Sequence, residues 1–357
     1  MRAAVLYERG APLVIEEVEL AAAGPGEVTV RLAASGVCHS DLHHWRREMG
    51  SPLPIVLGHE GAGVVEAVGP GVTHVQPGDH VVIAFGARCG RCYYCLRGMV
   101  HLCTPDSGPA APRLRRGEQR IHQFTGVGSF AERTTVPATN VVPIPAEVPL
   151  ASAALIACGV ATGVGAVLRT ARVPAGADVL VIGTGGVGLN VVQGARLAGA
   201  ARIIAADRLD AKLALARQFG ATDTINAARE DVLARVRALT GGRGVDYAFE
   251  VIGLPETVLL AYEAARKGGI AVVVGVGAPE ATVALPVLAL TRTARTVIGC
   301  AYGSIQPQAD FPLLVTLYQL GKLRLDELIS RRFALDEIND AFHALEAGEV
   351  ARGVVIY

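Results

Sequence analysis

The sequence has no excess of either charge. Its 357 residues carry 33 basic and 33 acidic side chains, so the formal net charge is zero. Proteins that bind nucleic acids or anionic membranes by electrostatic attraction usually have a strongly basic surface. The charge balance therefore argues against a nucleic-acid or membrane-surface partner and favours a small molecule.

The first twenty residues lack the features of a secretory signal. They contain four glutamates and no apolar core of the kind that signal peptides have, so we expect a cytoplasmic protein. The uncharged stretch 148–168 has the length of a membrane-spanning helix. It is rich in alanine and glycine and lacks aromatic and cationic anchors at both ends. We therefore expect buried helices at a domain junction there, and no membrane partner.

No internal repeat or low-complexity linker divides the chain, yet its pattern changes near residue 178. Length alone favours two domains, because single hydrophobic cores stop growing at roughly 250–300 residues. The first 150 residues contain short alternating runs, such as 28–32 and 63–68, between Gly and Pro turns, which is typical of β-strands. From residue 178, apolar strands alternate with helical stretches, which predicts an α/β fold with a doubly wound parallel sheet.

The expected elements of this second region are strands at 179–182, 202–207, 245–251 and 270–276, and helices at 212–219, 231–239 and 257–266. Beyond about residue 303, two helical patterns, at 311–320 and 336–346, precede a final strand at 353–357.

Four of the seven cysteines lie within fifteen residues, in the pattern C-x2-C-x2-C-x7-C formed by Cys89, Cys92, Cys95 and Cys103. Closely spaced thiolates on a tight loop can hold a tetrahedral zinc ion. Four unrelated buried thiols explain this polar, turn-rich segment poorly. An iron–sulfur cluster is a real alternative, since cysteines spaced by two residues also begin a ferredoxin motif. Four thiolates would close the coordination of zinc, so such a site would be structural.

Gly183, Gly185 and Gly188 form G-x-G-x-x-G directly after an expected strand and before a helix. In this context the glycines permit a tight turn, a close approach of a pyrophosphate and close packing of the helix on the strand. Asp207 ends the next expected strand, where a carboxylate can accept hydrogen bonds from an adenosine ribose. That carboxylate favours NAD over NADP, although the adjacent Arg208 offsets part of its repulsion of a 2′-phosphate.

Two Gly-rich turns, GVCHSD at 36–41 and GHE at 58–60, combine residue types that suit a metal site. A single Cys38 or His59 is more often an ordinary buried residue. Their occurrence together, in a chain that also has a dinucleotide loop, favours metal binding.

The pattern G-H-E-x2-G-x5-G-x2-V at 58–72, the four clustered cysteines and the glycine loop resemble the zinc-containing medium-chain alcohol dehydrogenases. The resemblance covers essentially the whole chain. It implies a GroES-like, mainly β catalytic domain formed by residues 1–159 and 303–357, which holds both zinc sites, and a Rossmann NAD-binding domain formed by residues 160–302.

The resemblance also implies that Cys38, His59 and Cys158 bind a catalytic zinc ion and leave its fourth position open for water or an alcohol. In the same way, Glu60 is expected beside the metal as an occasional ligand, and Asp41 is expected to orient His59. Neither role follows from spacing alone.

A proton path is implied from Ser40, which resembles the hydroxyl that takes the alcohol proton, to His43, which resembles the imidazole that receives it through the cofactor ribose. Because His44 is adjacent, only the register from Cys38 favours His43. The remaining cofactor contacts implied by the resemblance are His39 and Arg352 at the pyrophosphate, Thr162 and Val187 at the nicotinamide, and Lys212 at the ribose. Cys300 matches no ligand and is expected to be a buried thiol.

The substrate is expected to be a primary or aromatic alcohol, because the apolar residues Phe85, Leu102, Trp45 and Met49 are candidates for the cleft. The segments 154–166 and 244–253 resemble both bacterial aryl-alcohol enzymes and the class III branch, which oxidises the glutathione adduct of formaldehyde. The arginines at 113, 115, 116 and 120 suit either an acidic substrate or a solvated loop. A third reading is a zinc- and nucleotide-binding protein without catalysis. We expect a homodimer or homotetramer, joined in the family through an edge strand near 294–299.

Overall fold

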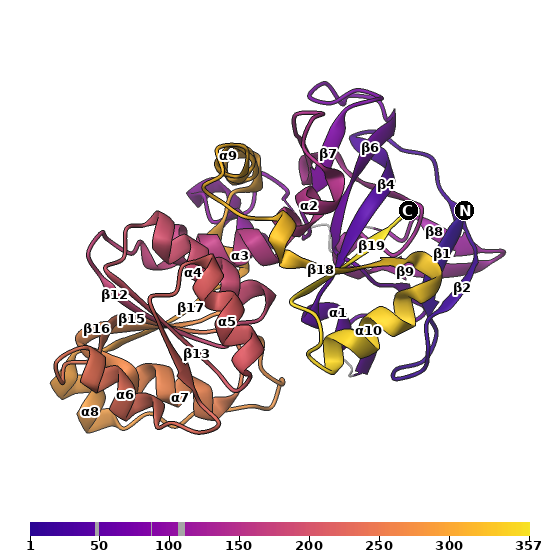
Figure 1. Ribbon diagram of the computed structural model, residues 1–357. Coiled ribbons are helices and arrows are strands. Elements are labelled where there is room, and N and C mark those ends of the chain that lie inside the picture. Colours follow the sequence, from indigo (N-terminus) through magenta and orange to yellow (C-terminus); the bar gives the residue numbers. More distant parts are fainter. Residues whose placement is uncertain (47–49, 87, 106–110) are drawn as a thin grey trace. The chain divides into compact units, whose positions relative to one another are not determined.

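The computed structural model describes residues 1–46, 50–86, 88–105 and 111–357. The chain forms two compact units, one made of Met1–Cys158 with Gln306–Tyr357 and the other of Gly159–Ile305 (Figure 1). The sequence predicts boundaries after residues 159 and 302, and the structure places them after Cys158 and Ile305.

The second unit is built on a six-stranded sheet with the order β14-β13-β12-β15-β16-β17, in which every pair of neighbours is parallel. This is the order 3-2-1-4-5-6 of a doubly wound dinucleotide-binding fold, so the predicted fold class is confirmed for this unit. Its strands are β12 (Asp178–Ile182), β13 (Arg202–Asp207), β14 (Asp223–Asn226), β15 (Val245–Glu250), β16 (Ala265–Val273) and β17 (Thr296–Gly299).

Helices cover this sheet because its strands carry apolar residues on both faces. Leu180, Ile182, Ile204 and Ala206 share one core cluster with residues of α6 and α7, while α4 packs against β12 and β13 and against α3. The helices of the unit are α3 (Gly159–Gly165), α4 (Gly186–Leu197), α5 (Asp210–Phe219), α6 (Val232–Leu239), α7 (Pro255–Ala264) and α8 (Val287–Thr293), and the π-helical turn η6 spans Ala166–Ala171.

Some local predictions for this unit differ from the structure. Helix α7 ends at Ala264 rather than at residue 266. Strand β16 begins at Ala265 rather than at residue 270, because residues 266–269 bulge from it where the register with β15 shifts. Strand β14 was not expected, since it is only four residues long and two of them are Asp and Asn, which are depleted in strands.

The first unit contains two further sheets, with the orders β2-β1-β5-β9-β8-β3 and β11-β7-β6-β4-β19-β18; β10 also pairs with β4. The strands of the first sheet are β1 (Arg2–Leu6), β2 (Val14–Glu17), β3 (Glu19–Leu20), β5 (Ile55–Val56), β8 (Leu114–Arg116) and β9 (Gln119–Gln123). Those of the second are β4 (Glu27–Val37), β6 (Glu60–Val68), β7 (His80–Ile83), β10 (Arg133–Pro137), β11 (Val141–Pro143), β18 (Ile329–Ala334) and β19 (Arg352–Ile356).

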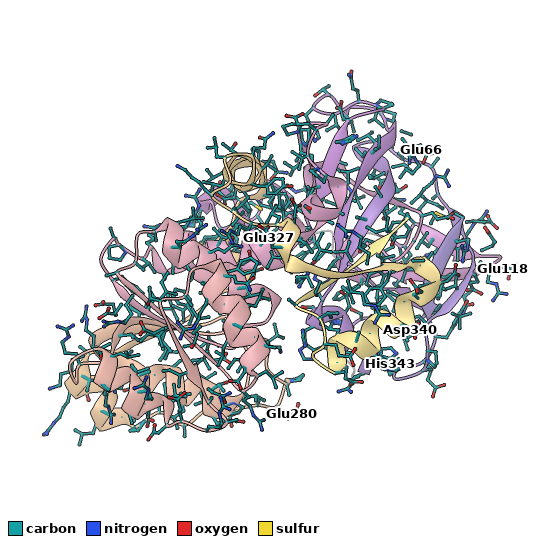
Figure 2. The ribbon with its side chains drawn as sticks, in the orientation of Figure 1. Glu66, Glu118, Glu280, Glu327, Asp340 and His343 are labelled. Atoms are coloured by element: carbon teal, nitrogen blue, oxygen red, sulfur yellow. The ribbon has the colours of Figure 1, made fainter. Side chains whose placement is uncertain are left out.

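The α-helices among the described residues of this unit are α1 (His39–Arg46), α2 (Leu150–Ala154), α9 (Pro307–Gln319) and α10 (Ile338–Glu346). Helix α10 places Phe342 and Leu345 in the core shared by β1, β5 and α1. Charged and polar side chains of both units lie at the surface and are exposed, as Figure 2 shows for Glu66, Glu118, Glu280, Glu327, Asp340 and His343.

The uncharged stretch 148–168 folds into short, largely buried helices, as predicted. It contains α2, the 3-10 turn η5 (Leu155–Ala157), all of α3 and the start of η6. Every residue of α3 is buried. Among the residues that the structure describes, no single helix is long and apolar enough to cross a membrane, and only the bent pair Leu150–Ala157 and Gly159–Ala171 passes that test together.

The carboxylate of Asp246 in β15 links three neighbouring strands at one end of the parallel sheet. It accepts hydrogen bonds from the amide of Asp178 in β12 at 2.7 Å and from Nε of Arg266 in β16 at 2.6 Å. Burial alone would raise the pKa of Asp246, but the Asp178 amide and the Arg266 guanidinium together lower it.

We predict that Asp246→Asn lowers the free energy of unfolding at neutral pH by about 1 kcal/mol, a value reduced for solvent screening because the carboxylate is partly exposed. A lowered folded-state pKa means that the contribution is present above the unfolded pKa of about 3.9 and is lost as the pH falls through the folded value. Urea unfolding at pH 7 and at pH 3 measures both effects. Glu280→Gln, which removes an exposed carboxylate from the same unit, is the control; equal losses in the two variants would contradict the prediction.

Candidate functional site

The predicted ligands Cys38 and His59 meet because two strands pair. Strands β4 and β6 are antiparallel, with Gly36 opposite Glu60, so Cys38 just after β4 and His59 just before β6 lie at the same end of the sheet. Twenty-one residues separate them in the sequence, but only the β4–β6 register makes them neighbours.

Cys158 reaches the same place from the helical segment that follows β11. Helix α2 packs against β4 and β6, η5 packs against β6, and Cys158 follows directly after η5. One possible donor atom from each of Cys38, His59, Glu60 and Cys158 lies within 4.8 Å of the others, and all four residues are buried.

The carboxylate of Asp41 holds the two ligand-bearing turns together. Its Oδ2 accepts from the amide of Cys38 at 3.1 Å, and its Oδ1 accepts from the amide of Gly58 at 2.9 Å and contacts Nδ1 of His59 at 3.0 Å. Asp41 is fully buried, so these contacts compensate for the loss of its hydration. With Nδ1 as the donor to Asp41, Nε2 of His59 is the unprotonated nitrogen that a metal needs.

This donor set fits a zinc ion. Nε2 of His59 is buried and has no hydrogen-bond partner among the described residues, and the two sulfur atoms lie close by. Two thiolates and one imidazole form a Cys₂His set, which in zinc enzymes leaves the fourth coordination position open. The mixed sulfur and nitrogen donors also argue against magnesium and calcium, which prefer oxygen ligands.

The buried groups shift one another's titration before any metal charge is added. A hydrogen bond between the two thiols lowers the pKa of Cys38 and raises that of Cys158. Burial alone would lower the pKa of His59, but the negative charges of Asp41 and then Cys38 raise it well above its usual value. The raised pKa values of Cys158 and His59 favour their protonated forms in the absence of a cation. A bound divalent cation would favour the deprotonated forms that act as ligands.

Glu60 is paired with Arg352 rather than pointing freely toward a metal. Both side chains are buried, and a guanidinium nitrogen of Arg352 contacts Oε2 of Glu60. Burial raises the pKa of Glu60 to about 7 in spite of the arginine, because the desolvation of a carboxylate outweighs a single ion pair. A Cβ atom at Gly36 would lie 1.9 Å from Oε2 of Glu60, so the pair needs a glycine at that position.

Arg352 arrives at the site on strand β19, whose Gly353 pairs with Val37 of β4. The sequence comparison implies a contact of Arg352 with a cofactor pyrophosphate. In the structure the arginine is 4% exposed and engaged with Glu60, a partner that spacing across 292 residues could not reveal. The pyrophosphate contact remains a prediction.

Helix α1 separates the two adjacent histidines onto different faces. His44 turns back toward the carbonyl oxygen of Ser40, 3.0 Å from Nδ1, and packs on Phe124 with ring centroids 4.1 Å apart. Burial lowers the pKa of His44. His43 instead shares a face with His39, at a centroid distance of 6.5 Å, and lies one helical turn from Ser40. This arrangement supports His43 over His44 as the proton carrier.

Of the apolar residues expected at a substrate cleft, Phe85 lies beside the candidate metal ligands. Its ring meets His59 edge-on at 5.2 Å. Phe124, which the sequence did not indicate, meets the same imidazole edge-on at 5.4 Å. Trp45 belongs to the core instead, where its indole donates to the carbonyl of Ala11 and its ring packs on Phe342. Leu102 is partly exposed near the clustered cysteines, and Met49 lies outside the described residues.

The four clustered cysteines form a second compact donor set. The sulfur of Cys103 lies 3.6 Å from that of Cys89 and 3.9 Å from that of Cys92. A tetrahedron with Zn–S bonds of 2.3 Å has edges of about 3.8 Å, so these separations fit a zinc ion. Backbone amides of Cys89, Cys92 and Cys95 point at neighbouring sulfur atoms at 3.3–3.5 Å, which stabilises thiolates.

The glycine loop in the second unit has the geometry that a dinucleotide needs. Gly183 has a φ of +91°, which favours glycine, and a Cβ atom at Gly188 would lie 1.9 Å from the carbonyl oxygen of Gly183. At Gly185 a Cβ would meet no described atom within 4 Å, so the loop is open where a phosphate would approach. Helix α4 begins at Gly186, directly after this turn.

The other predicted cofactor residues of this unit lie around the same loop. Val187 is in the first turn of α4, and Thr162 is buried in α3, where the backbone of Gly163 approaches the carbonyl oxygen of Val187. Asp207 ends β13 and Lys212 lies in α5. Thr184, which the sequence did not single out, donates to Asp207 from both its amide and its hydroxyl; only its place inside the glycine motif marked it.

Three of the four arginines at 113–120 are already neutralised by glutamates. Arg113 pairs with Glu27, Arg115 with Glu19 and Arg116 with Glu16. These contacts join β8 and its flank to the N-terminal strands. Arg115 and Arg116 pair with glutamates at the surface and remain exposed, which agrees with the solvated-loop alternative. Arg120 is exposed.

Comparison with known proteins agrees with this architecture. The family model described as the alcohol dehydrogenase GroES-like domain matches residues 24–146, and the one described as zinc-binding dehydrogenase matches residues 186–319. The NDMA-dependent alcohol dehydrogenase of Amycolatopsis methanolica is 41% identical over 366 residues, covering 100% of this chain and 98% of that protein. The S-(hydroxymethyl)glutathione dehydrogenase of Synechocystis is 39% identical over 367 residues, covering 100% and 99%.

Among solved structures, the benzyl alcohol dehydrogenase of Acinetobacter calcoaceticus has a TM-score of 0.93 at 33% identity, covering 99% of this chain and 98% of that one. Identity above 30% over full length shows common ancestry as well as a common fold. The chain is therefore an oxidoreductase that belongs to the zinc-containing medium-chain alcohol dehydrogenase family.

Proposed function

We propose that the chain is a zinc-dependent alcohol dehydrogenase that transfers a hydride between a primary or aromatic alcohol and NAD. The observation that carries the proposal is the Cys38, His59 and Cys158 cluster in a chain that also has an open dinucleotide loop. The buried Nε2 of His59 has no hydrogen-bond partner in the part of the chain that the structure describes. A non-catalytic zinc- and nucleotide-binding protein would have no need of a ligand set with one open position.

The chain's own residues account for binding and proton movement. When bound, zinc supplies a Lewis acid that lowers the pKa of an alcohol hydroxyl, and NAD supplies the hydride acceptor. Ser40 takes the hydroxyl proton, and His43, whose usual pKa is near 6.5, passes it toward solvent. Asp41 keeps the His59 ring in the orientation in which Nε2 faces the two sulfur atoms.

The edge-on packing of Phe85 and Phe124 against His59 supports an apolar alcohol. Aromatic walls next to the reacting carbon favour flat or alkyl substrates over polyols, whose hydroxyls would lose hydrogen bonds to water. The benzyl alcohol dehydrogenase of Acinetobacter calcoaceticus resembles this chain in fold and length, which supports an aromatic alcohol.

A second candidate is the oxidation of S-(hydroxymethyl)glutathione, favoured by the 39% identity to the Synechocystis enzyme of that name. Glutathione carries two carboxylates, and a site for it needs cations that are not already paired. Because Arg113, Arg115 and Arg116 are bound to glutamates, we rank this activity second.

The clustered cysteines support a second, structural zinc ion, which would stiffen the loop around 89–103. Sites built on free thiolates persist in reducing compartments, so we propose a cytoplasmic location. His39 and Arg352 at the pyrophosphate, Thr162 and Val187 at the nicotinamide, and Lys212 at the ribose complete the proposed cofactor contacts.

We also propose that the protein forms a dimer, or a tetramer built from dimers, through β17 and α8. Strand β17 is the last strand of its sheet, and an edge strand offers unpaired backbone groups to another chain. In the adjacent α8, Val287 is 77% exposed and Leu288 is 64% exposed. An apolar helix beside a free edge suits a twofold interface with a second copy.

The proposed activity is tested by following NAD reduction with metal-replete protein and ethanol, benzyl alcohol, sorbitol, or glutathione mixed with formaldehyde. We expect turnover with the primary and aromatic alcohols, little with sorbitol, and loss of turnover after chelation. Turnover confined to the glutathione mixture would establish the second candidate. No turnover with any substrate would contradict an enzymatic role.

Replacing single cysteines should separate the two metal sites. We expect Cys158→Ala to lower kcat about 100-fold or more while metal analysis still finds one zinc per chain, since even partners of metal ligands are worth 10–100-fold. Cys95→Ser should also leave one zinc but lower the melting temperature first. Cys300→Ala, at the cysteine outside both clusters, is the control and should keep two. Loss of both zinc ions from either site variant would rule out independent sites.

The interface is tested by Val287→Asp combined with Leu288→Asp, because buried unpaired carboxylates strongly disfavour association. We expect sedimentation to show a dimer or larger species for the native protein and a smaller one for the variant. Leu320→Asp, which replaces an exposed leucine of the first unit, should leave the association unchanged. A monomeric native protein would refute the proposed interface.

A further inference from the structure

One carboxylate oxygen of Asp207 accepts two hydrogen bonds from the same residue. Oδ2 accepts a hydrogen bond from the amide of Thr184 at 2.9 Å and another from the Thr184 hydroxyl at 3.1 Å. Thr184 stands between Gly183 and Gly185 in the glycine motif and is 1% exposed. The loop that would approach a pyrophosphate is thus tied directly to the carboxylate expected at the ribose.

This carboxylate can accept few further hydrogen bonds. An ionised carboxylate has about four acceptor positions. Two on Oδ2 are filled by Thr184, and the amide of Leu209 fills one on Oδ1 at 3.2 Å. One acceptor position therefore remains, on Oδ1, which is enough for one ribose hydroxyl.

The two bonds from Thr184 have different origins. The amide bond follows from the backbone, because Gly183 donates to the carbonyl of Ala206 at 2.9 Å and so aligns the loop with the end of β13. Any residue except proline at position 184 would keep it. The hydroxyl bond depends on the side chain, and among the twenty residues only Thr and Ser place a hydroxyl there.

We propose that Thr184 determines the nucleotide specificity of this chain by locking the Asp207 carboxylate in one orientation. The inference rests on the proposed function, since it concerns the nucleotide of that same reaction. A locked carboxylate presents Oδ1 to a ribose hydroxyl without paying further rotamer entropy. It also holds a fixed negative charge where a 2′-phosphate would have to bind.

Without the hydroxyl, the carboxylate would keep only the bonds from the amides of Thr184 and Leu209 and would be freer to turn. Arg208 follows Asp207 directly and is exposed, so a turned carboxylate would meet a neighbouring cation and repel a 2′-phosphate less. Removal of the hydroxyl therefore weakens NAD binding more than NADP binding. A purely structural role of Thr184 would weaken both nucleotides alike.

The test compares Thr184→Val and Thr184→Ser with a matched control, Thr240→Val. Thr240 is another buried threonine of the same unit, and its hydroxyl donates to the carbonyl of Val236 at 2.7 Å and accepts from the amide of Gly244 at 3.0 Å. Dissociation constants for NADH and NADPH are measured by nucleotide fluorescence on the full chain without substrate. If the valine variant does not fold, Thr184→Ala replaces it.

We expect Thr184→Val to raise the Kd for NADH about fivefold and the Kd for NADPH less than about twofold, so that the preference for NADH falls. Thr184→Ser should retain most of the native preference, and Thr240→Val should retain all of it. Equal weakening of both nucleotides, an unchanged preference in the valine variant, or a loss in the control of the same size would each overturn the inference. A native protein that binds neither nucleotide would instead overturn the proposed function.

Discussion

The arrangement of the candidate metal ligands depends on the contacts of the Asp41 carboxylate. It is fully buried, and its three contacts tie the turn after β4 to the turn before β6. A buried charge is tolerated only when it is fully hydrogen-bonded, so the two turns cannot move apart without leaving it unsatisfied. The same contacts fix which nitrogen of His59 is free. One side chain thereby sets both the distance between two ligands and the protonation pattern of one of them.

A buried ion pair lies beside this cluster. Glu60 and Arg352 form an ion pair that is fully enclosed by protein, and the absence of a side chain at Gly36 makes room for it. Such a pair costs more to desolvate than it returns in attraction unless other charges lie nearby. The Cys38 sulfur, whose lowered pKa favours a thiolate, and the carboxylate of Asp41 supply negative charge close by. A bound divalent cation would balance the set, which links metal binding to the stability of the fold.

The sequence was most informative where a local pattern of residues has a single physical explanation. The alternation of strands and helices after residue 178 and the glycine loop predicted a parallel sheet, which the structure confirms. The four clustered cysteines predicted a metal site because their spacing is local. By contrast, the pairing of Glu60 with Arg352 and the packing of Phe124 on His59 depend on strand register and on residues far apart in the chain. No local pattern encodes such contacts.

The structure also distinguishes between site residues that the sequence could assign only from the family resemblance or from their hydrophobicity. His43 and His44 could not be separated by spacing, yet the periodicity of α1 puts them on different faces. Trp45 was expected at a cleft because it is large and apolar, and the same properties place it in the core against Phe342. Hydrophobicity predicts burial but not which of several apolar surfaces a side chain joins.

The way in which β4 is covered has a consequence for the order in which the chain folds. One edge of β4 pairs with β6, while the other is shared by β10 along its first half and by β19 along its second. During synthesis, β10 emerges early, whereas β19 emerges only after the whole of the second unit. The half of β4 next to Cys38 therefore stays uncovered, and Glu60 stays without Arg352, while some two hundred further residues are made. A nascent chain can fold its parallel sheet in that interval, but the Glu60–Arg352 pair beside the candidate metal ligands is completed last.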